Sequence, residues 1–191
     1  APILPEADYA DTAELVIRPI LDYMAAKGQP FKGVLYAGLM FTEAGPMVLE
    51  YNVRFGDPEC QPLLMRLDAD LLEIMLACVE GRLGEVDVAC RPETSLCVVM
   101  AAKGYPADYP KGMAITGIKA AENEYVKVFQ AGTRLKDGKV VTSGGRVLGV
   151  TALGADLAEA KQRAYTAVDS VDFKDSYVRR DIGDKGLQRL S

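Results

Sequence analysis

Residues 48–59 read VLEYNVRFGDPE, and the interpretation of the chain starts from this stretch. Side chains of an extended strand alternate between two faces, which makes one face of this strand apolar and the other polar. The apolar face carries Leu49, Tyr51 and Val53, and the polar face carries Glu50, Asn52 and Arg54. At a rise of about 3.3 Å per residue, Glu50 and Asn52 lie about 6 to 7 Å apart at their Cα atoms. Their side-chain oxygens can therefore converge on one small, hard cation.

A polar strand face also has a purely structural explanation, because the outer face of a half-buried strand meets water. The residues after the strand favour a binding site over this structural explanation. Gly56 permits unusual backbone angles, Asp57 is a good helix N-cap, and Pro58 suits the first helical position. A strand end with acid, amide and guanidinium groups that runs into a helix N-terminus predicts a corner for phosphate and metal.

Several segments carry a resemblance to one family. Residues 50–59, preceded by GVLYAGLM at 33–40, resemble the phosphoribosylamine–glycine ligases, also called glycinamide ribonucleotide synthetases, of the ATP-grasp superfamily. The likeness continues in VVMAAKGYP at 98–106, SGGRVL at 143–148 and RDIG at 180–183. These segments follow the family's order and span nearly the whole chain.

The resemblance implies an α+β fold with two domains. Residues 1–90 are expected to be the carboxy-terminal part of an ATP-grasp domain, and residues 91–191 a small, mostly antiparallel β-domain with a packed helix. The enzymes of this family carry an amino-terminal domain and the front half of the ATP-grasp domain before this point. The chain is therefore expected to be a carboxy-terminal part, which agrees with a start at APILP that reads as a loop.

The resemblance also implies an activity, which is ATP-dependent ligation of glycine to 5-phosphoribosylamine in de novo purine synthesis. The products are glycinamide ribonucleotide, ADP and phosphate. The implied route phosphorylates the glycine carboxylate, and the amine then attacks the resulting glycyl phosphate. The implied cofactors are ATP and Mg²⁺, or Mn²⁺ in its place. The expected partners are the two substrates and the missing amino-terminal part of the same enzyme.

Four residues of the opening stretch are candidate site residues, and two of them, Glu50 and Asn52, match the family motif. Glu50 and Asn52 are assigned as metal ligands that also hold the ATP phosphates. Arg54 is assigned to the transferring phosphoryl group or the glycine carboxylate, where its planar fork can bind two oxygens. Asp57 is assigned to the glycine ammonium, and a plain N-cap role is the alternative. Glu59 is explained by the helix dipole.

Two further positions of the resemblance lie outside that stretch. Gly145 and Arg146 are candidates for an anionic substrate, because the carboxy-terminal domain of this enzyme class closes over the active site. A simple glycine turn is the alternative.

Many ATP-grasp relatives carry another metal-binding carboxylate about thirteen residues before the equivalent of Glu50, where this chain has Ala37. Lys103 is expected to be solvated, with contact to a phosphate as the alternative.

Composition limits the classes of function. With 191 residues, 49% of them hydrophobic, the chain can bury a core. Its net charge of −5 and lack of a basic run argue against a nucleic-acid partner. Without an apolar run of about 18 residues, we expect a cytoplasmic protein and no membrane partner. The absence of histidine excludes a Ser-His or Cys-His nucleophile and a His-ligated metal within the chain.

The four cysteines are irregularly spaced and predict reduced, buried thiols rather than disulfides or a zinc site. They are Cys60, Cys78, Cys90 and Cys97.

Helices are predicted in both halves of the chain. Residues 11–14 (DTAE) have the spacing of a capping arrangement, and helical periodicity then runs to Gly28. Pro19 falls inside this segment and predicts a kink or two shorter helices. Asp70 is predicted to cap another helix that ends at Gly81.

Strand patterns dominate the rest. The predicted strands are residues 33–41, 46–51, 95–102, 113–118, 125–131, 133–136, 139–143 and 146–152. Asp137 and Gly138 predict a tight hairpin turn. Residues 155–168 predict an amphipathic helix that packs against the sheet, and the arginines at 179 and 180 predict a surface ion pair with Asp181.

Two other functions remain open at this point. One is a different ATP-grasp ligase or carboxylase of purine synthesis. The other is a non-catalytic module that docks with the missing amino-terminal part, because the chain shows no adenine pocket and no phosphate-covering loop.

Overall fold

In the computed structural model, which describes residues 6–190, internal contacts divide the chain into two units. The first, here called the hairpin unit, contains the described residues before Pro58 together with Leu67–Cys90. The second, here called the sheet unit, contains Pro58–Arg66 and the described residues from Arg91 onward. The predicted domain boundary between residues 90 and 91 stays a prediction.

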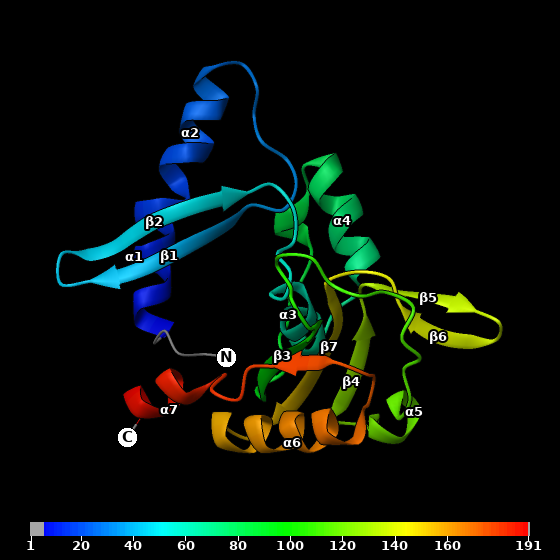
Figure 1. Ribbon diagram of the computed structural model, residues 1–191. Helices are drawn as coiled ribbons and strands as arrows, with labels where there is room; N and C mark the ends of the chain where they lie inside the picture. The colour runs from blue at the N-terminus through cyan, green and yellow to red at the C-terminus, as the bar shows by residue number, and fades with distance from the viewer. Residues whose placement is uncertain (1–5, 191) are drawn as a thin grey trace. The chain divides into compact units, whose positions relative to one another are not determined.

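Each unit has its own set of elements (Figure 1). The hairpin unit comprises α1 (Glu6–Val16), α2 (Arg18–Ala26), β1 (Tyr36–Thr42), β2 (Gly45–Asn52), α4 (Leu71–Glu80) and the 3₁₀-helix η1 (Leu83–Glu85). The sheet unit comprises α3 (Cys60–Arg66), β3 (Thr94–Ala102), α5 (Ile118–Ala121), β4 (Val126–Gln130), β5 (Thr133–Lys136), β6 (Lys139–Thr142), β7 (Arg146–Gly154), α6 (Leu157–Ser170), β8 (Ser176–Val178) and α7 (Asp184–Leu190).

The first helical segment is broken, as Pro19 predicts. α1 ends at Val16 and α2 begins at Arg18, with the proline in its first turn, where a missing backbone N–H is tolerated. The predicted start near residues 11–14 is wrong, because α1 already begins at Glu6. Glu14 does not cap a helix. It accepts hydrogen bonds from Arg18, one turn further on, with Nη2 at 2.9 Å from Oε1.

The predicted first hairpin is confirmed. β1 and β2 pair in antiparallel register, with Gly38 opposite Glu50 and an irregularity between Gly38 and Leu39. The predicted caps of α4 are also confirmed. Asp70 Oδ1 accepts from the backbone N–H of Leu72 at 2.8 Å, and Gly81 closes the helix in the left-handed conformation.

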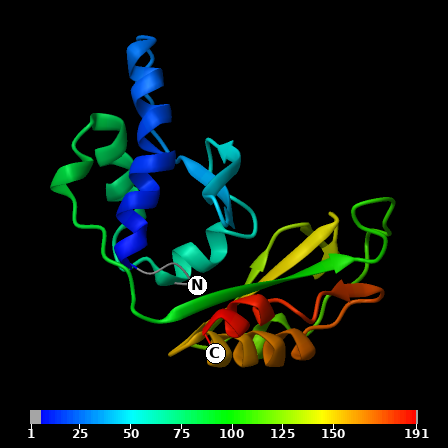
Figure 2. The same cartoon turned by 90° about the vertical axis from the view of Figure 1, so that its left-hand side faces the viewer.

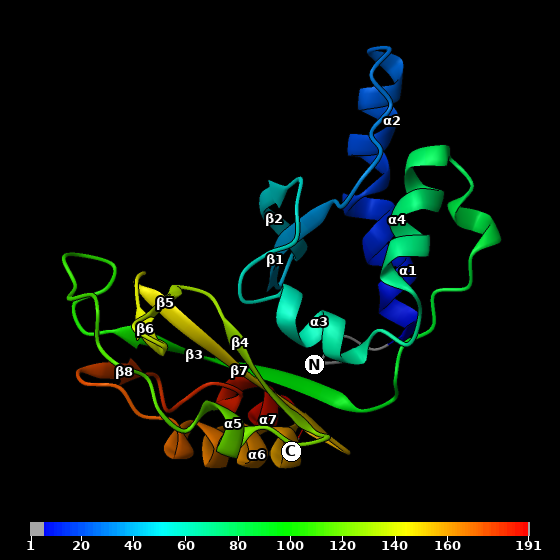
Figure 3. The same ribbon diagram turned by 90° about the vertical axis from the view of Figure 1, so that its right-hand side faces the viewer.

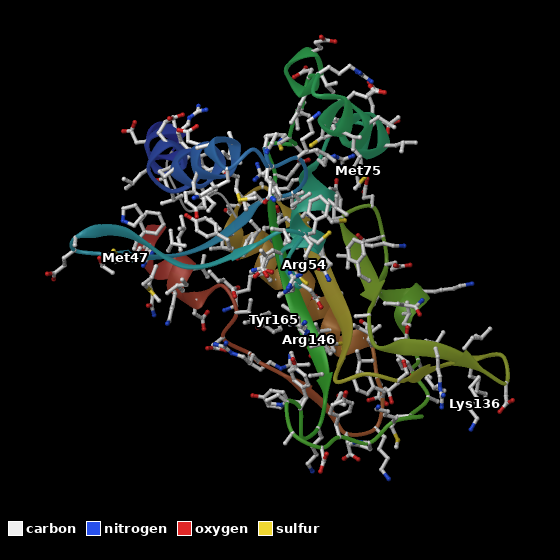
Figure 4. The ribbon with its side chains drawn as sticks, turned by 90° about the horizontal axis from the view of Figure 1, so that it is seen from above. Met47, Arg54, Met75, Lys136, Arg146 and Tyr165 are labelled. Carbon is white, nitrogen blue, oxygen red and sulfur yellow. The ribbon has the colours of Figure 1, made fainter. Side chains whose placement is uncertain are left out.

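The hairpin unit buries little apolar surface. Within residues 9–57 and 67–90, the buried hydrophobic side chains are Val16 and Ala77. The apolar face predicted for β2 is exposed, with Leu49 at 64% and Val53 at 70% of full exposure. Met47 and Met75, labelled in Figure 4, belong to the exposed apolar residues of β2 and α4.

The sheet unit is built on four antiparallel strands in the order β4-β7-β3-β8. Helix α6 covers one face, and Figure 2 shows it lying beside the long strand β3. Helix α3 contacts β3 and β7 from the opposite side (Figure 3). The core lies between α6 and the sheet. Its largest fully buried members are Met100, Leu148, Val98, Val147 and Val150.

Most predicted strands of this unit are confirmed, including the hairpin of β5 and β6. Its turn has φ of 49° at Asp137 and 74° at Gly138, the positive values that a tight primed turn requires. The strand predicted for 113–118 is wrong. Ala114 and Thr116 form isolated bridges to two different partners, and α5 starts immediately after Gly117, whose φ is 82°.

The helix predicted at 155–168 is confirmed as α6, capped by Asp156. Its Tyr165, labelled in Figure 4, donates from its hydroxyl to the carbonyl of Arg179 at 2.7 Å and accepts from the backbone N–H of Ile182. The predicted ion pair between Arg179 and Asp181 is present at 2.6 Å.

All four cysteines are free, as expected, but their predicted burial is wrong. Cys90 is exposed and the other three are half-buried. Cys97, for example, alternates along β3 with the buried Leu96 and Val98 and therefore lies on the other face of the strand. Among residues 6–190, none of the helices combines the length and apolar character that a membrane span needs.

Candidate functional site

The polar face of β2 brings Glu50 and Asn52 together. Asn52 Nδ2 donates to Glu50 Oε1 at 3.0 Å, which requires both side chains to lie on the same side of the strand. Gly38 stands opposite Glu50 on β1, and a Cβ at Gly38 would lie 3.2 Å from Glu50 Cγ. The absence of a side chain at residue 38 therefore gives the carboxylate its room.

The donor set of this pair fits a divalent cation that prefers oxygen. One carboxylate and one amide carbonyl are hard ligands, and Mg²⁺ is commonly bound by one or two carboxylates together with phosphates and water. Residues 6–190 contain no cluster of three or more Asp, Glu, Cys or His side chains suited to a metal. A cation at Glu50 and Asn52 would thus take most of its ligands from a phosphate-bearing molecule and water.

The predicted polar face ends before Arg54. β2 stops at Asn52, and Arg54 lies in a bend beyond it, where Nη1 donates to the carbonyl of Phe55 at 2.8 Å. Strand alternation does not extend to Arg54, because the strand has ended and residues 53–54 form a bend.

The helix after this bend begins later than Pro58. α3 starts at Cys60, and residues 57–59 form a turn ahead of it. The backbone N–H of Leu63 donates to the carbonyl of Glu59 at 3.3 Å, so the helical hydrogen bonds begin one residue after the proline. Asp57 therefore lies three residues before the start of α3.

Gly145 and Arg146 belong to the sheet unit, whereas Glu50, Asn52, Arg54 and Asp57 belong to the hairpin unit. Gly145 is buried, and its carbonyl accepts from the backbone N–H of Ala102 at 2.8 Å. Arg146 is exposed at the start of β7, with its Cα paired to that of Ala101.

The glycines around Arg146 have a packing cause. A Cβ at Gly144 would lie 2.9 Å from the Cα of Gly132, and one at Gly132 would lie 2.5 Å from the carbonyl oxygen of Arg146. Two backbone segments thus approach too closely for side chains. Sequence reasoning favoured a glycine turn but missed the reason, because the close approach joins residues far apart in the chain.

The structure adds two residues that sequence reasoning did not single out. Tyr105 and Tyr109 lie against Gly145, and a Cβ at Gly145 would lie 2.2 Å from Tyr105 Cδ2 and 3.0 Å from Tyr109 Cε1. The signal in the sequence is that both tyrosines directly precede prolines, and that Tyr105 falls within residues 98–106 of the family resemblance.

Comparison with known proteins finds matches to both halves of the chain. The sequence model described as "Phosphoribosylglycinamide synthetase, ATP-grasp (A) domain" matches residues 1–60, and the one described as "Phosphoribosylglycinamide synthetase, C domain" matches residues 95–185. A phosphoribosylamine–glycine ligase of Rhodopirellula baltica is 55% identical over 98% of this chain and 43% of its own length. One of Mesorhizobium japonicum is 48% identical over 99% of this chain and 44% of its own length.

Solved structures show the same relationship. The crystal structure of phosphoribosylamine–glycine ligase from Thermotoga maritima superposes with a TM-score of 0.82 at 35% identity, over 95% of this chain and 45% of that one. A biotin carboxylase domain of Hydrogenobacter thermophilus shares only the fold, with a TM-score of 0.68 at 14% identity over 100% of this chain and 42% of that one. The predicted α+β fold is thereby confirmed. The chain spans less than half the length of the ligases it matches.

Proposed function

The chain belongs to the phosphoribosylamine–glycine ligase family, and on that basis we propose that it is the carboxy-terminal part of an enzyme that ligates glycine to 5-phosphoribosylamine. ATP supplies the driving force, and the products are glycinamide ribonucleotide, ADP and phosphate. The observation that carries the proposal is the hydrogen-bonded pair of Glu50 and Asn52 on one face of β2. A cytoplasmic location remains a prediction.

Glu50 and Asn52 would hold Mg²⁺, with Mn²⁺ as the alternative ion, against the phosphates of ATP. Asn52 Nδ2 is turned toward the Glu50 carboxylate. The atoms that would bind the cation are therefore the carboxylate oxygens of Glu50 and the amide oxygen of Asn52. A cation bound there neutralises phosphate charge, which is the main requirement of phosphoryl transfer.

Arg54 would bind the transferring phosphoryl group or the glycine carboxylate. Its hydrogen bond to Phe55 uses one of five guanidinium N–H groups and holds the side chain in place. A fork held in this way can bind two oxygens of an anion without first being ordered, and it stabilises negative charge as glycyl phosphate forms.

Asp57 would bind the glycine ammonium. Because α3 starts three residues later, at Cys60, Asp57 does not have the position of a first-turn helix cap. The substrate role and a structural role in this turn are separated by replacing the carboxylate alone. Glu59, whose carbonyl accepts the first hydrogen bond of the helix, is explained structurally.

Gly145 and Arg146 would bind the anionic substrate, for which the phosphate of 5-phosphoribosylamine is the suitable group. The Cα side of Gly145 is covered by two tyrosine rings, so this residue would contribute through its backbone. Arg146 is the exposed member and would supply the charge.

The hairpin unit would pack against the amino-terminal part of the same enzyme. On α4, four apolar side chains recur at the spacing of one helix face, and all are exposed: Leu72, Met75, Leu76 and Val79. The curated relatives are more than twice as long as this chain, and an exposed apolar stripe of this kind is typical of a surface that another part covers.

Glu50→Gln in the full-length ligase tests the proposal. We expect kcat to fall about 100- to 1,000-fold, because the metal and the ATP phosphates lose a charged ligand. Glu43→Gln is the matched control, since Glu43 lies exposed in the turn of the same hairpin and should leave kcat unchanged. A kcat within twofold of the wild type for Glu50→Gln would refute the assignment.

The carboxylase alternative is not favoured. The sequence relatives are glycine ligases, whereas the carboxylase likeness rests on 14% identity and concerns the fold. Product analysis with glycine against bicarbonate as acceptor separates the two activities.

A further inference from the structure

The turn that carries Arg146 is covered by two aromatic rings. Gly145 is buried beneath Tyr105 and Tyr109, and the nearest ring atoms lie 2.2, 2.9 and 3.0 Å from where a Cβ would stand. Gly145 is not among the glycines with positive φ, so its backbone conformation would accept an alanine. The rings, rather than the backbone angles, require glycine at this position.

The loop that bears the tyrosines is folded back on itself. Gly104 has φ of 100°, and a Cβ there would lie 2.2 Å from the carbonyl oxygen of Asp108. The backbone N–H of Tyr105 donates to the carbonyl of Ala102 at 3.1 Å. The rings of Tyr105 and Tyr109 are tilted by 59° with centroids 6.2 Å apart, and Tyr109 also packs against the core. Both rings therefore have a defined position above the turn.

The other side of the turn is held by backbone hydrogen bonds. The N–H groups of Ser143 and Gly144 both donate to the carbonyl of Gly132, at 2.7 and 3.0 Å. The N–H of Gly132 donates to the carbonyl of Arg146 at 2.9 Å. The turn is thus clamped between the bend at Gly132 and the two rings, and Arg146 is its exposed end.

We propose that Tyr105 and Tyr109 are positioning residues that hold the 143–146 turn, and through it Arg146, in the conformation that receives a phosphate-bearing substrate. This inference rests on the proposed role of Arg146 toward 5-phosphoribosylamine. The rings fill the space into which the turn would otherwise relax, and a displacement of about 1 Å in a positioning group is enough to cost a large factor in binding or rate.

Tyr105→Ala in the full-length ligase is the main test. We expect the KM for 5-phosphoribosylamine to rise about 10-fold, while kcat and the KM values for ATP and glycine stay within twofold. Tyr105→Phe should restore the wild-type KM, because the atoms against Gly145 are ring carbons. Tyr125→Ala is the matched control, since it removes a ring of the same unit that stacks on Arg163 instead.

A double-mutant cycle tests the contact itself. Gly145→Ala should raise the same KM, because the new methyl group displaces the ring of Tyr105. In Gly145→Ala combined with Tyr105→Ala, the methyl group loses its two closest contacts and keeps the one to Tyr109 Cε1 at 3.0 Å, so the KM should stay close to that of Tyr105→Ala alone. If the KM increases of the two single variants simply multiply in the double variant, the proposed contact is overturned.

Arg146→Gln separates the inference from the proposed function. If Arg146→Gln leaves the KM for 5-phosphoribosylamine unchanged, the role of Arg146 fails, and the role of the tyrosines fails with it. If Arg146→Gln raises that KM but Tyr105→Ala does not, only the positioning role is overturned. A rise for Tyr125→Ala equal to that for Tyr105→Ala would also overturn it, because a general loss of stability would then explain both.

Discussion

Individual side chains of the candidate site are placed by short-range geometry. Glu50 and Asn52 are two residues apart on a strand and therefore share a face, which the hydrogen bond between them confirms. Gly38, on the opposite strand, leaves room for the carboxylate. Arg54 departs from this alternation because the strand ends at Asn52.

Asp57→Asn distinguishes a substrate role from a structural one. Asparagine caps helices as well as aspartate does, so a structural role predicts an unchanged enzyme. If Asp57 binds the glycine ammonium, loss of the charge should raise the KM for glycine about 10- to 100-fold, as expected for a hydrogen bond to a charged group. Steady-state kinetics on the full-length ligase measure this. An unchanged KM and kcat would remove the substrate role.

Glu122 predicts an effect of pH on stability. Burial raises the pKa of its carboxyl, but hydrogen bonds from Lys127 and from the backbone N–H of Val128 lower it more, and the net pKa lies below the ordinary value. A carboxyl whose pKa falls on folding stabilises the folded state above its unfolded pKa. This stabilisation is lost as the pH drops through the lower, folded pKa.

Glu122→Gln should therefore destabilise the chain at pH 7 and lose its difference from the wild type on acidification below about pH 4, the ordinary range of a glutamate. Thermal unfolding between pH 7 and pH 3 measures the difference. Glu124→Gln, at an exposed neighbouring acid, is the control. A difference between Glu122→Gln and the wild type that grows as the pH falls would contradict the prediction.

Helices and strands form where local signals are strong. α4 has both of its predicted caps, and the hairpin of β5 and β6 has its predicted Asp-Gly turn. Both predictions from the sequence were therefore correct. The start of α1 was missed because Glu14 pairs with Arg18 inside the helix instead of capping it. The segment 113–118 failed as a strand because its isolated bridges are divided between Val141 and Asp172.

Asp70→Ala should destabilise α4 by about 1 kcal/mol, because the backbone N–H groups of Leu72 and Glu73 lose their acceptor. Asp70→Asn should retain nearly all of the stability. Asp68→Ala, at an exposed acid outside the cap, is the control. Thermal unfolding followed by far-ultraviolet circular dichroism reports the change. Equal losses for Asp68→Ala and Asp70→Ala would contradict a specific capping role.

The two units of the molecule differ in how much apolar surface they bury. The sheet unit has a continuous core between α6 and its strands. The hairpin unit exposes the apolar stripe of α4 together with much of β2. Since burial of apolar surface is the main stabilising term in folding, the hairpin unit is expected to depend on a surface outside this chain.

Leu72→Ser and Val79→Ser test that dependence. In this 191-residue chain the two side chains are 66% and 71% exposed, so each substitution should change the stability by less than about 0.5 kcal/mol. In the full-length ligase each should cost about 2 kcal/mol, because the proposed amino-terminal part covers them. Denaturant unfolding of both proteins measures the two values. Equal effects in the short and long proteins would refute the covered surface.

The sequence alone was sufficient for the hairpin, the caps and the shared face of Glu50 and Asn52, because these depend on residues close together in the chain, and the family resemblance was sufficient for the α+β class. The tertiary structure alone revealed the glycine opposite Glu50, the rings over Gly145 and the exposure of the hairpin unit. Each of these depends on segments separated by 12 residues or more, and their approach is determined by packing that no local pattern encodes.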